Sequence, residues 1–489
     1  MKPRVFVLGL DGADDHSVGV AFRAGIMPNL KRLVGDRLLP LKSTPLPITP
    51  AAWTSAYTGY NPGKTGVLTF QRHIPNTYRG RIVNSHDVGN SGFHTRLAEQ
   101  GKKVLSIGFP MMSPPPACDG AIIVSGWDSA PNVPLANDAQ TADMLLRHGY
   151  RIDDDLTADA SLLRQGIGTR FSILRELLTV RSDWDCAMVY LGFIDSLGHR
   201  LGFGNTETQD LLAETDRELG QLLPHLPPDV SFIVCSDHGF GQFTQSFSVI
   251  QWLEESGYLT LRSRNLRKSS QGVPGVELMD LEDGLIDWSS TRAFCWEAIG
   301  RHAAIALNVK GTYPGGIVNP REAFALSGEI MEKLRATIDP ATGQPIVVDA
   351  RRREELFWGP KVSEFPELFL ETARGTTAYI GKRARTENGF ALEHGTLHAG
   401  RFNSHLDDGV WGSSFDVPAD GLRVEDLAPT VYALLDVTIP EDCDGLNRSQ
   451  RRTLVGATAG ATADARESSA YSAEEEEIVR KRLEDLGYL

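Results

Sequence analysis

The sequence predicts an α/β fold, in which a mostly parallel central sheet is flanked by helices and interrupted by an inserted subdomain. Three observations support this class. Several segments are nearly continuous apolar runs, which are typical of strands buried on both faces of a parallel sheet. Amphipathic helical segments alternate with these runs, and that order is typical of a doubly wound sheet. The alternation stops after residue 240 and resumes in the last quarter of the chain.

The expected strands are short and rich in Val, Ile, Leu and Phe. The first is RVFVLGLDG at residues 4–12, and the others are KKVLSIGFP at 102–110, DCAMVYLGFID at 185–195 and DVSFIVCSDHGFG at 229–241. Apolar residues at helical spacing predict the helices that connect and cover these strands. The expected helices lie at residues 27–34, 92–101, 170–181, 208–226 and 424–437.

These changes of pattern divide the chain into five parts. Residues 1–240 form the first part of the α/β core, and residues 391–455 form its remainder. Between them, residues 241–390 mix short strand-like pieces, Gly/Pro turns and one helix, which indicates an inserted cap or substrate subdomain. Residues 456–471 are rich in Ala, Thr and Ser and are expected to form a linker. Residues 472–489 are expected to form a terminal helix, with Ser472 as its N-cap and acids in its first turn.

Composition excludes some classes of partner. A net charge of −14 over 489 residues argues against binding to a nucleic-acid polymer or to an anionic membrane surface, because both are polyanions. A small anionic substrate is still compatible with this charge, since a metal ion can hold it. The five cysteines are dispersed without a CxxC pair, so we expect reduced thiols rather than a disulfide framework.

The sequence also suggests where the protein resides. The N-terminal run MKPRVFVLGLDGADD meets acidic residues at once and lacks the apolar region and cleavage site of a signal peptide. No segment offers the roughly 18 uninterrupted apolar residues that a membrane span needs. A cytoplasmic protein without a membrane span is therefore expected.

Acidic residues at the ends of the predicted strands are the most informative feature. Asp11 follows VLGL, Asp195 follows VYLGFI, and Asp237 follows FIVCS. Ligands of open α/β sheets bind outside the carboxyl ends of the strands, so these carboxylates are expected to lie at one edge. His238 directly follows Asp237, and His199 comes one helical turn after Asp195. Three carboxylates at one edge repel one another unless a positive charge lies among them.

Mixed Asp and His ligands without a thiolate suit zinc, manganese or another divalent cation. A further candidate ligand is His405 in NSHLDDGVWG. Each of these residues alone carries little weight, because a single strand-end Asp is more often a helix cap or a turn residue. The ordered set, with each acid at a strand end, is what favours a metal site.

At this point the sequence resembles the alkaline phosphatase superfamily, in its branch of type I phosphodiesterases and nucleotide pyrophosphatases. The resemblance rests on six segments, which follow one another in the family's order over residues 5 to about 446. They are VLGLDG, TPAAWTSAYTGYNPGKTGV, DSLGH, SDHGF, SHLDDGV and DLAPTVYALLDVTIPEDCDG. The resemblance implies an alkaline-phosphatase-like fold and a phosphohydrolase that uses two divalent metal ions, with zinc favoured and manganese as the alternative.

The resemblance also implies which residues bind metal. One ion would be held by a strand-end Asp, the nucleophile and an Asp-His pair, and the second by the DxxxH element and a late His. In this sequence the first set is Asp11, Thr49, Asp237 and His238, and the second set is Asp195, His199 and His405.

Thr49 is identified as the nucleophile by the family's spacing. In the diesterase branch the nucleophilic Thr precedes a Thr-Gly pair by nine residues, and Thr58-Gly59 is that pair here. The plain structural interpretation is that Thr49 is an N-cap before Pro50 at the first helical position, and this role is compatible with a nucleophilic one. As a nucleophile, Thr49 would attack phosphorus and form a phosphothreonine-type intermediate. Hydrolysis of this intermediate would then release the phosphoryl group and regenerate Thr49. Thr54 is expected to pack and Thr58 to shape the following turn.

One position departs from the family pattern. Nucleotide pyrophosphatases place an Asn 21 residues after the nucleophile to donate to a phosphoryl oxygen, and this sequence has Phe70 there. Lys64, Arg72 and His73 are nearby candidates to replace that donor, although a role as surface charge is expected for each. The departure leaves the preference for diesters over monoesters open.

Other members of the superfamily fit less well. Sulfatases need a CxPxR-type motif, which TPAAW does not provide, and cofactor-independent phosphoglycerate mutases use Ser as the nucleophile. A phosphomonoesterase acting on a small phosphorylated metabolite or nucleotide is the main alternative, and a non-catalytic binding protein is a weaker one, since none of the seven ligands is missing. Five residues of the subdomain are candidate substrate contacts, although a structural role is favoured for each: Trp288, Arg292, Trp296, Arg301 and His302.

Overall fold

The computed structural model describes residues 2–88, 92–155, 157–262, 265–266, 285–381, 383–386, 389–456 and 471–486. The chain forms two compact units, and each draws on more than one stretch of sequence. The first unit comprises Met1–Val67, Val83–Gly241 and Leu406–Val479, and the second comprises Leu68–Ile82, Gln242–His405 and Arg480–Leu489. Among the described residues, no helix is both long and apolar enough to cross a bilayer. The expected cytoplasmic location stays a prediction.

The first unit is built on a seven-stranded sheet with the order β2-β19-β8-β1-β7-β5-β6. The five strands from β8 to β6 run parallel, whereas β19 is antiparallel to both β8 and β2. The predicted mostly parallel α/β sheet is therefore confirmed. Its strands are β1 Val5–Leu10, β2 Leu39–Lys42, β5 Val104–Ile107, β6 Ala121–Val124, β7 Cys186–Leu191, β8 Ser231–Cys235 and β19 Asp408–Ser413.

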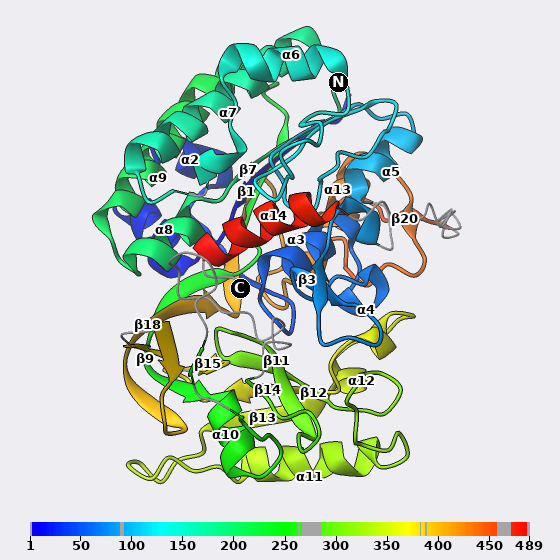
Figure 1. Ribbon diagram of the computed structural model, residues 1–489. Coiled ribbons are helices and arrows are strands. Elements are labelled where there is room, and N and C mark those ends of the chain that lie inside the picture. The colour runs from blue at the N-terminus through cyan, green and yellow to red at the C-terminus, as the bar shows by residue number, and fades with distance from the viewer. Residues whose placement is uncertain are drawn as a thin grey trace. The chain divides into compact units, whose positions relative to one another are not determined.

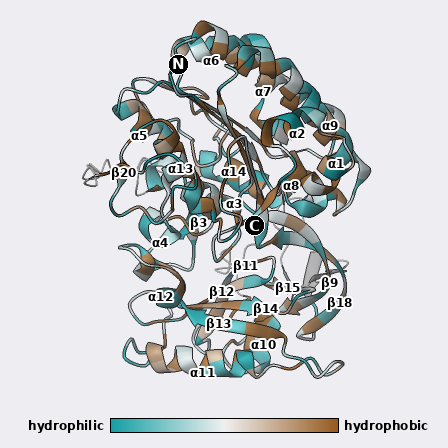
Figure 2. Ribbon diagram, turned by 180° about the vertical axis from the view of Figure 1, so that it is seen from behind, coloured by the Kyte–Doolittle hydropathy of each residue, from teal (hydrophilic) through white to brown (hydrophobic). Residues whose placement is uncertain are grey.

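Helices cover this sheet on both faces (Figure 1). On one face, alternate residues of β1 such as Phe6 and Leu8 belong to a large apolar core that also includes side chains of α2, α6, α7, α8 and α9. In Figure 2, α7 and α9 carry both hydrophobic and hydrophilic residues, as expected for helices with one face on a sheet. The helices are α1 Val20–Arg23, α2 Pro28–Val34, α3 Thr49–Thr58, α4 Pro62–Thr65, α5 Phe93–Glu99, α6 Ala139–His148, α7 Ala160–Val180, α8 Phe193–Leu201, α9 Thr206–Leu222 and α13 Leu427–Leu434.

The second unit contains a four-stranded antiparallel sheet with the order β11-β12-β14-β13, and α11 packs against it. Strands β9 and β18 belong to a separate three-stranded sheet with β15. The elements are β3 Gln71–His73, β4 Gly80–Ile82, β9 Gly239–Ser248, α10 Val249–Glu255, β10 Asn265–Leu266, β11 Ala293–Ile299, β12 His302–Leu307, α11 Ala323–Arg335, β13 Val347–Arg352, α12 Arg353–Leu356, β14 Leu368–Thr372, β15 Thr376–Tyr379, β16 Arg383–Thr386, β17 Gly389–Leu392 and β18 Leu397–Leu406.

The C-terminal part ends in helix α14, Ala473–Leu486, after the short strands β20 Ile439–Pro440 and β21 Val455–Gly456. The backbone N–H of Glu475 donates to the hydroxyl of Ser472 at 3.3 Å, so Ser472 caps this helix as predicted. The predicted linker at 456–471 lies almost wholly outside the described residues.

Candidate active site

The candidate site lies at the carboxyl edge of the central strands of the first unit. In the parallel register of β1, β7 and β8, Leu10 lies opposite Leu191 and Gly9 lies opposite Cys235. The three strands therefore end together, and the residues that follow them meet. Asp11 and Asp237 are fully buried there, and Asp195 is 2% exposed.

Asp237 and His238 are held in fixed orientations next to Asp11. The N–H of Gly12 donates to Asp237 Oδ1 at 3.3 Å. His238 Nε2 lies 3.1 Å from Asp237 Oδ2 and 3.5 Å from Asp11 Oδ1. His238 Nδ1 donates to the carbonyl of Gly239 at 3.0 Å, because a carbonyl can only accept. A neutral imidazole in this tautomer presents the lone pair of Nε2 to the two carboxylates.

This concentration of buried carboxylates shifts their protonation. Burial raises the pKa of Asp11 well above its usual value, and the charge of Asp195 adds to the increase. Burial likewise raises the pKa of Asp237, followed by the charges of Asp11 and Asp195. Asp11 Oδ1 and Asp237 Oδ2 are both buried and accept no hydrogen bond from the described residues. Such oxygens are costly to bury unless a cation lies among them.

The residues at this edge fit a divalent cation. Asp11, Asp195 and His238 each offer one ligand atom, and these atoms all lie within 4.8 Å of one another. Two carboxylates and an imidazole nitrogen form a donor set that suits zinc or manganese. The buried oxygens Asp11 Oδ1 and Asp237 Oδ2 also favour a cation at this edge, because a bound cation would provide them with a partner.

Helix α8 presents Asp195 in its first turn and His199 in its last turn. His199 Nε2 lies 3.4 Å from Asp195 Oδ1, so the two side chains share one helical face. The ring of Phe240, two residues after His238, packs edge-on against the His199 ring with centroids 4.8 Å apart. This contact restricts rotation of the His199 imidazole.

Thr49 is the first residue of α3, and it is fully buried. Its Oγ1 lies 3.4 Å from His238 Nε2, which brings the threonine hydroxyl to the same group of ligands. The prediction that Thr49 is an N-cap is wrong. The N-cap is Ile48, with Pro50 in the second helical position and no side-chain capping bond. The predicted helix start is thus one residue too late.

The other two threonines of this segment have local partners. The Thr54 hydroxyl lies 3.2 Å from the Tyr57 hydroxyl, and the Thr58 hydroxyl donates to the carbonyl of Thr54 at 2.6 Å. Gly59 then ends the helix with a φ of +78°, a conformation that favours glycine. These contacts agree with packing for Thr54 and turn formation for Thr58.

His405 is also fully buried. It is the last residue of the Gln242–His405 segment of the second unit and is bonded directly to Leu406, which begins the final segment of the first unit. The side chain of Leu406 packs against Gly241, where a Cβ would lie only 2.9 Å from it.

The candidates to replace the missing phosphoryl-binding Asn have protein partners. Lys64 forms a 2.8 Å ion pair with Asp444. Arg72 Nε lies 3.8 Å from a carboxylate oxygen of Glu364, and His73 Nε2 donates to the Thr77 carbonyl at 2.8 Å. Phe70 itself is 2% exposed.

The proposed substrate contacts of the subdomain make several structural interactions within the second unit. Trp288 stacks on Tyr78 with ring centroids 3.6 Å apart. The guanidinium of Arg292 lies 5.0 Å from the centre of the Tyr258 ring. The remaining three have contacts of their own: Trp296 with His73, Arg301 with Glu371, and His302 in register with Ile299 on β11. These contacts agree with the structural roles that were favoured.

Three residues of the site were not predicted from the sequence. Trp53 and Tyr190 donate to Asp11, and Gly12 donates to Asp237. Trp53 lies four residues after Thr49 on α3, so helical spacing could have indicated that both face one way. No sequence signal distinguishes Tyr190 from the other buried residues of its strand.

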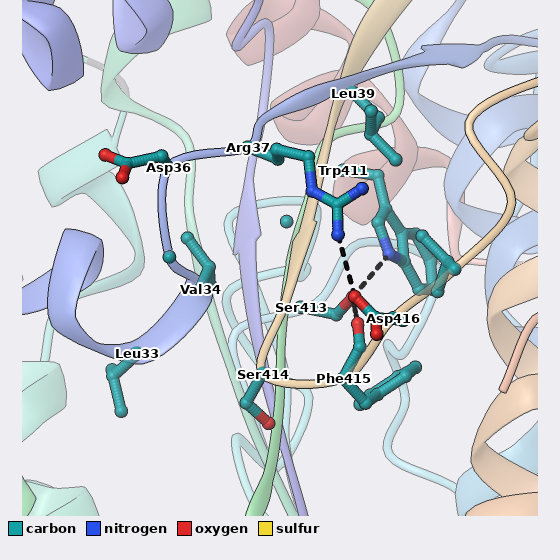
Figure 3. Close-up of a pocket in the computed structure, with 13 residues that line it drawn as sticks. Leu33, Val34, Asp36, Arg37, Leu39, Trp411, Ser413, Ser414, Phe415 and Asp416 are labelled. Carbon is teal, nitrogen blue, oxygen red and sulfur yellow. Dashed lines mark hydrogen bonds and ion pairs between the residues drawn. The ribbon is translucent and has the colours of Figure 1, made fainter. Parts of the chain in front are cut away.

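A separate cavity of about 400 Å³ lies beside β2 and β19 of the first unit (Figure 3). Trp411 and Val34 contribute to its lining. Two of its charged residues, Arg37 and Asp416, form a 2.7 Å ion pair. Among the residues that the structure describes, no histidine lines this cavity, so its lining differs from the group of Asp and His side chains at the strand ends.

Comparison with known proteins places this chain in a family. Residues 5–396 match the family model of type I phosphodiesterases/nucleotide pyrophosphatases. The chain belongs to this family. It is therefore an enzyme, a phosphohydrolase of the phosphodiesterase/pyrophosphatase type. No curated protein sequence matches it.

Solved structures agree with the fold of this phosphodiesterase-family chain. Phosphonoacetate hydrolase from Sinorhizobium meliloti 1021, in complex with phosphonoformate, superposes with a TM-score of 0.60 at 17% identity. The match covers 89% of this chain and 96% of that one. An inactive variant of murine ectonucleotide pyrophosphatase/phosphodiesterase 5, in complex with AMP, gives a TM-score of 0.51 at 12% identity, over 90% of this chain and 97% of its own. At these identities the likeness concerns the fold alone, and the alkaline-phosphatase-like fold expected from the sequence is confirmed.

Proposed function

We propose that this enzyme is a two-metal phosphohydrolase that cleaves a phosphodiester or a nucleotide pyrophosphate through a covalent intermediate on Thr49. The observation that carries the proposal is the position of the Thr49 hydroxyl, 3.4 Å from His238 Nε2 in a buried group of carboxylates. A threonine hydroxyl is a poor nucleophile near neutral pH, and its presence among metal-ligand side chains gives it a means of activation.

The metal ligands are assigned as two sets. Asp11, Asp237 and His238, with the Thr49 oxygen, would hold one ion. A second ion would be held by Asp195, His199 and His405. Zinc is the favoured metal and manganese the alternative, since the donors are carboxylates and imidazoles without a thiolate. When bound, the ions would favour the deprotonated form of Thr49 and offset charge on the phosphoryl oxygens.

The reaction then follows from the residues of the chain. The Thr49 oxygen forms a bond to phosphorus while the bond from phosphorus to the leaving oxygen breaks, and the threonine proton ends on the leaving group. The positive end of the α3 dipole, at the helix start that carries Thr49, favours the phosphoryl anion. Water next attacks the phosphothreonine, releases the phosphoryl group and returns a proton to Thr49.

A phosphomonoesterase acting on a small phosphorylated metabolite or nucleotide is the second candidate. Phe70 keeps it open, because a buried phenyl ring cannot donate the hydrogen bond that the family's Asn supplies, and one support for a diester preference is therefore missing. The two structural neighbours are complexes with phosphonoformate and with AMP, and we infer a small anionic phosphorus compound as the substrate here as well.

The test is a substrate panel on the metal-reconstituted enzyme. Bis-p-nitrophenyl phosphate, p-nitrophenyl phosphate and nucleotide esters are compared, each with wild type, Thr49→Ala and the control Thr54→Val. Diester cleavage that is lost in Thr49→Ala and kept in Thr54→Val is expected. Full activity of Thr49→Ala would contradict the nucleophile, and a monoester rate far above the diester rate would favour the second candidate.

A further inference from the structure

One oxygen of Asp11 is held by two neutral donors. The Trp53 indole N–H donates to Asp11 Oδ2 at 3.0 Å, and the Tyr190 hydroxyl donates to the same oxygen at 2.7 Å. The other oxygen, Oδ1, faces His238 Nε2 at 3.5 Å. The carboxylate is therefore divided into one oxygen bound to the protein and one oxygen directed to the ligand group.

A third residue fixes the direction of the Tyr190 hydroxyl. Trp127 Nε1 lies 3.0 Å from the Tyr190 oxygen, and an indole N–H can only donate. With that hydrogen bond on its oxygen, Tyr190 directs its own single proton to Asp11. The chain of donors thus runs from Trp127 through Tyr190 to Asp11 Oδ2.

The surrounding backbone and rings leave room for this arrangement. Trp53, Phe109 and Tyr190 pack against one another with ring centroids 5.1 to 5.8 Å apart. A Cβ on Gly9 would lie 2.9 Å from both Trp53 and Phe109, and one on Gly192 would lie 2.9 Å from the Tyr190 hydroxyl. Both positions therefore need glycine for the rings to reach Asp11.

We propose that Tyr190, Trp53 and Trp127 are positioning residues that orient Asp11 for metal binding. The hydrogen bonds from Trp53 and Tyr190 occupy the acceptor positions of Asp11 Oδ2. They leave Oδ1 as the ligand atom and prevent the carboxylate from rotating. They also stabilise the charged carboxylate without adding a charge to the site. The inference rests on the proposed metal site, and it assigns a role to residues outside the ligand set.

The test measures metal affinity directly. The full chain is stripped of metal, and Zn²⁺ is titrated in competition with a chromophoric chelator. Tyr190→Phe is expected to bind Zn²⁺ about tenfold more weakly than wild type, because partners of metal ligands typically contribute 10–100-fold to affinity. The matched control is Tyr150→Phe, which loses a 2.8 Å hydrogen bond to the Ser125 carbonyl in the same unit. It should bind Zn²⁺ as wild type does.

Thermal unfolding in EDTA separates this role from a general loss of stability. Tyr190→Phe and Tyr150→Phe should have similar melting temperatures without metal and differ only in affinity. If Tyr190→Phe does not fold, the Zn²⁺ affinity of Trp127→Phe tests the positioning role instead. Trp127→Phe should also bind Zn²⁺ more weakly than Tyr150→Phe.

Asp11→Asn distinguishes the two ways in which the idea could fail. If wild type binds no Zn²⁺, or if Asp11→Asn leaves binding unchanged, both the metal site and this inference are wrong. If Asp11→Asn loses the binding of one Zn²⁺ ion while Tyr190→Phe and Trp127→Phe match Tyr150→Phe, the positioning role alone is contradicted.

Discussion

Replacement of Gly12 by alanine would test how closely the metal site is packed. Gly12 has a φ of +69°, in the left-handed region that favours glycine. A Cβ at this position would lie 3.0 Å from the Cβ of Asp195 and 3.1 Å from its Cα. The substitution therefore acts in two ways, through the backbone conformation and through a steric push on a proposed metal ligand.

The two effects can be given separate magnitudes. An alanine in the left-handed region costs about 1–2 kcal/mol. The steric contribution adds about 1–3 kcal/mol, the usual cost of inserting a methyl group into a packed site. To reach an ordinary contact of 3.4 Å, Asp195 must move by about 0.4 Å. A displacement of that size approaches the tolerance of roughly 0.5 Å for a working site, so we expect metal affinity to fall about tenfold.

Gly25→Ala is the matched control, because Gly25 has a φ of +74° and nothing within 4 Å of its would-be Cβ. It measures the backbone cost alone. Chelator competition gives the metal affinity of both variants, and thermal unfolding in EDTA gives their stability. Gly12→Ala should be less stable than Gly25→Ala and bind metal more weakly. Equal metal affinity in the two variants would refute the close packing of Asp195 against Gly12.

Two further predictions concern charge. In EDTA, the melting temperature should rise as the pH falls from 7.5 to 5.5. The pKa values of Asp11 and Asp237 are raised in the folded state. At a pH above the ordinary pKa of aspartate, the folded state therefore binds more protons than the unfolded state, and lowering the pH stabilises it. Saturating Zn²⁺ should abolish this rise. A pH-independent melting temperature in EDTA would contradict the raised pKa values, which burial causes first and the charges of neighbouring carboxylates second. Lys64→Met should lower the melting temperature through loss of the Asp444 ion pair but leave the KM for bis-p-nitrophenyl phosphate unchanged. An increase in KM of tenfold or more would instead mean that Lys64 binds the phosphoryl group.

The sequence predicted the core of the fold because its strands are buried on both faces. Continuous apolar runs such as that of β1 are best interpreted as buried strands. The residue at which such a run ends then marks the end of the strand, and this identifies the acids that follow it. Helix boundaries were less predictable. Helix α7 was expected to begin at residue 170 but begins at Ala160. Gly166 lies in this first part, and glycine has a low helix propensity. Its close packing against Asp154, with a would-be Cβ 2.8 Å away, is a tertiary effect that the sequence does not display.

The sequence predicted the residues of the site that can bind metal or react. It did not predict the residues that only position them. Asp237 and His238 are recognisable as ligand types at a strand end. The donors to Asp11 are not, because a buried Trp53 or Tyr190 has the same sequence signature as a core residue. Their hydrogen bonds depend on the packing of rings from α3 and β7, which only the folded chain brings together.

The stereochemistry of cleavage at phosphorus tests the covalent intermediate on Thr49 most directly. A chiral phosphorothioate diester is hydrolysed in ¹⁸O-labelled water, and the configuration of the thiophosphate product is determined. Attack by Thr49 followed by attack of water inverts the phosphorus twice, so net retention is expected. Net inversion would contradict the intermediate, because it would show that water attacks the substrate in a single displacement.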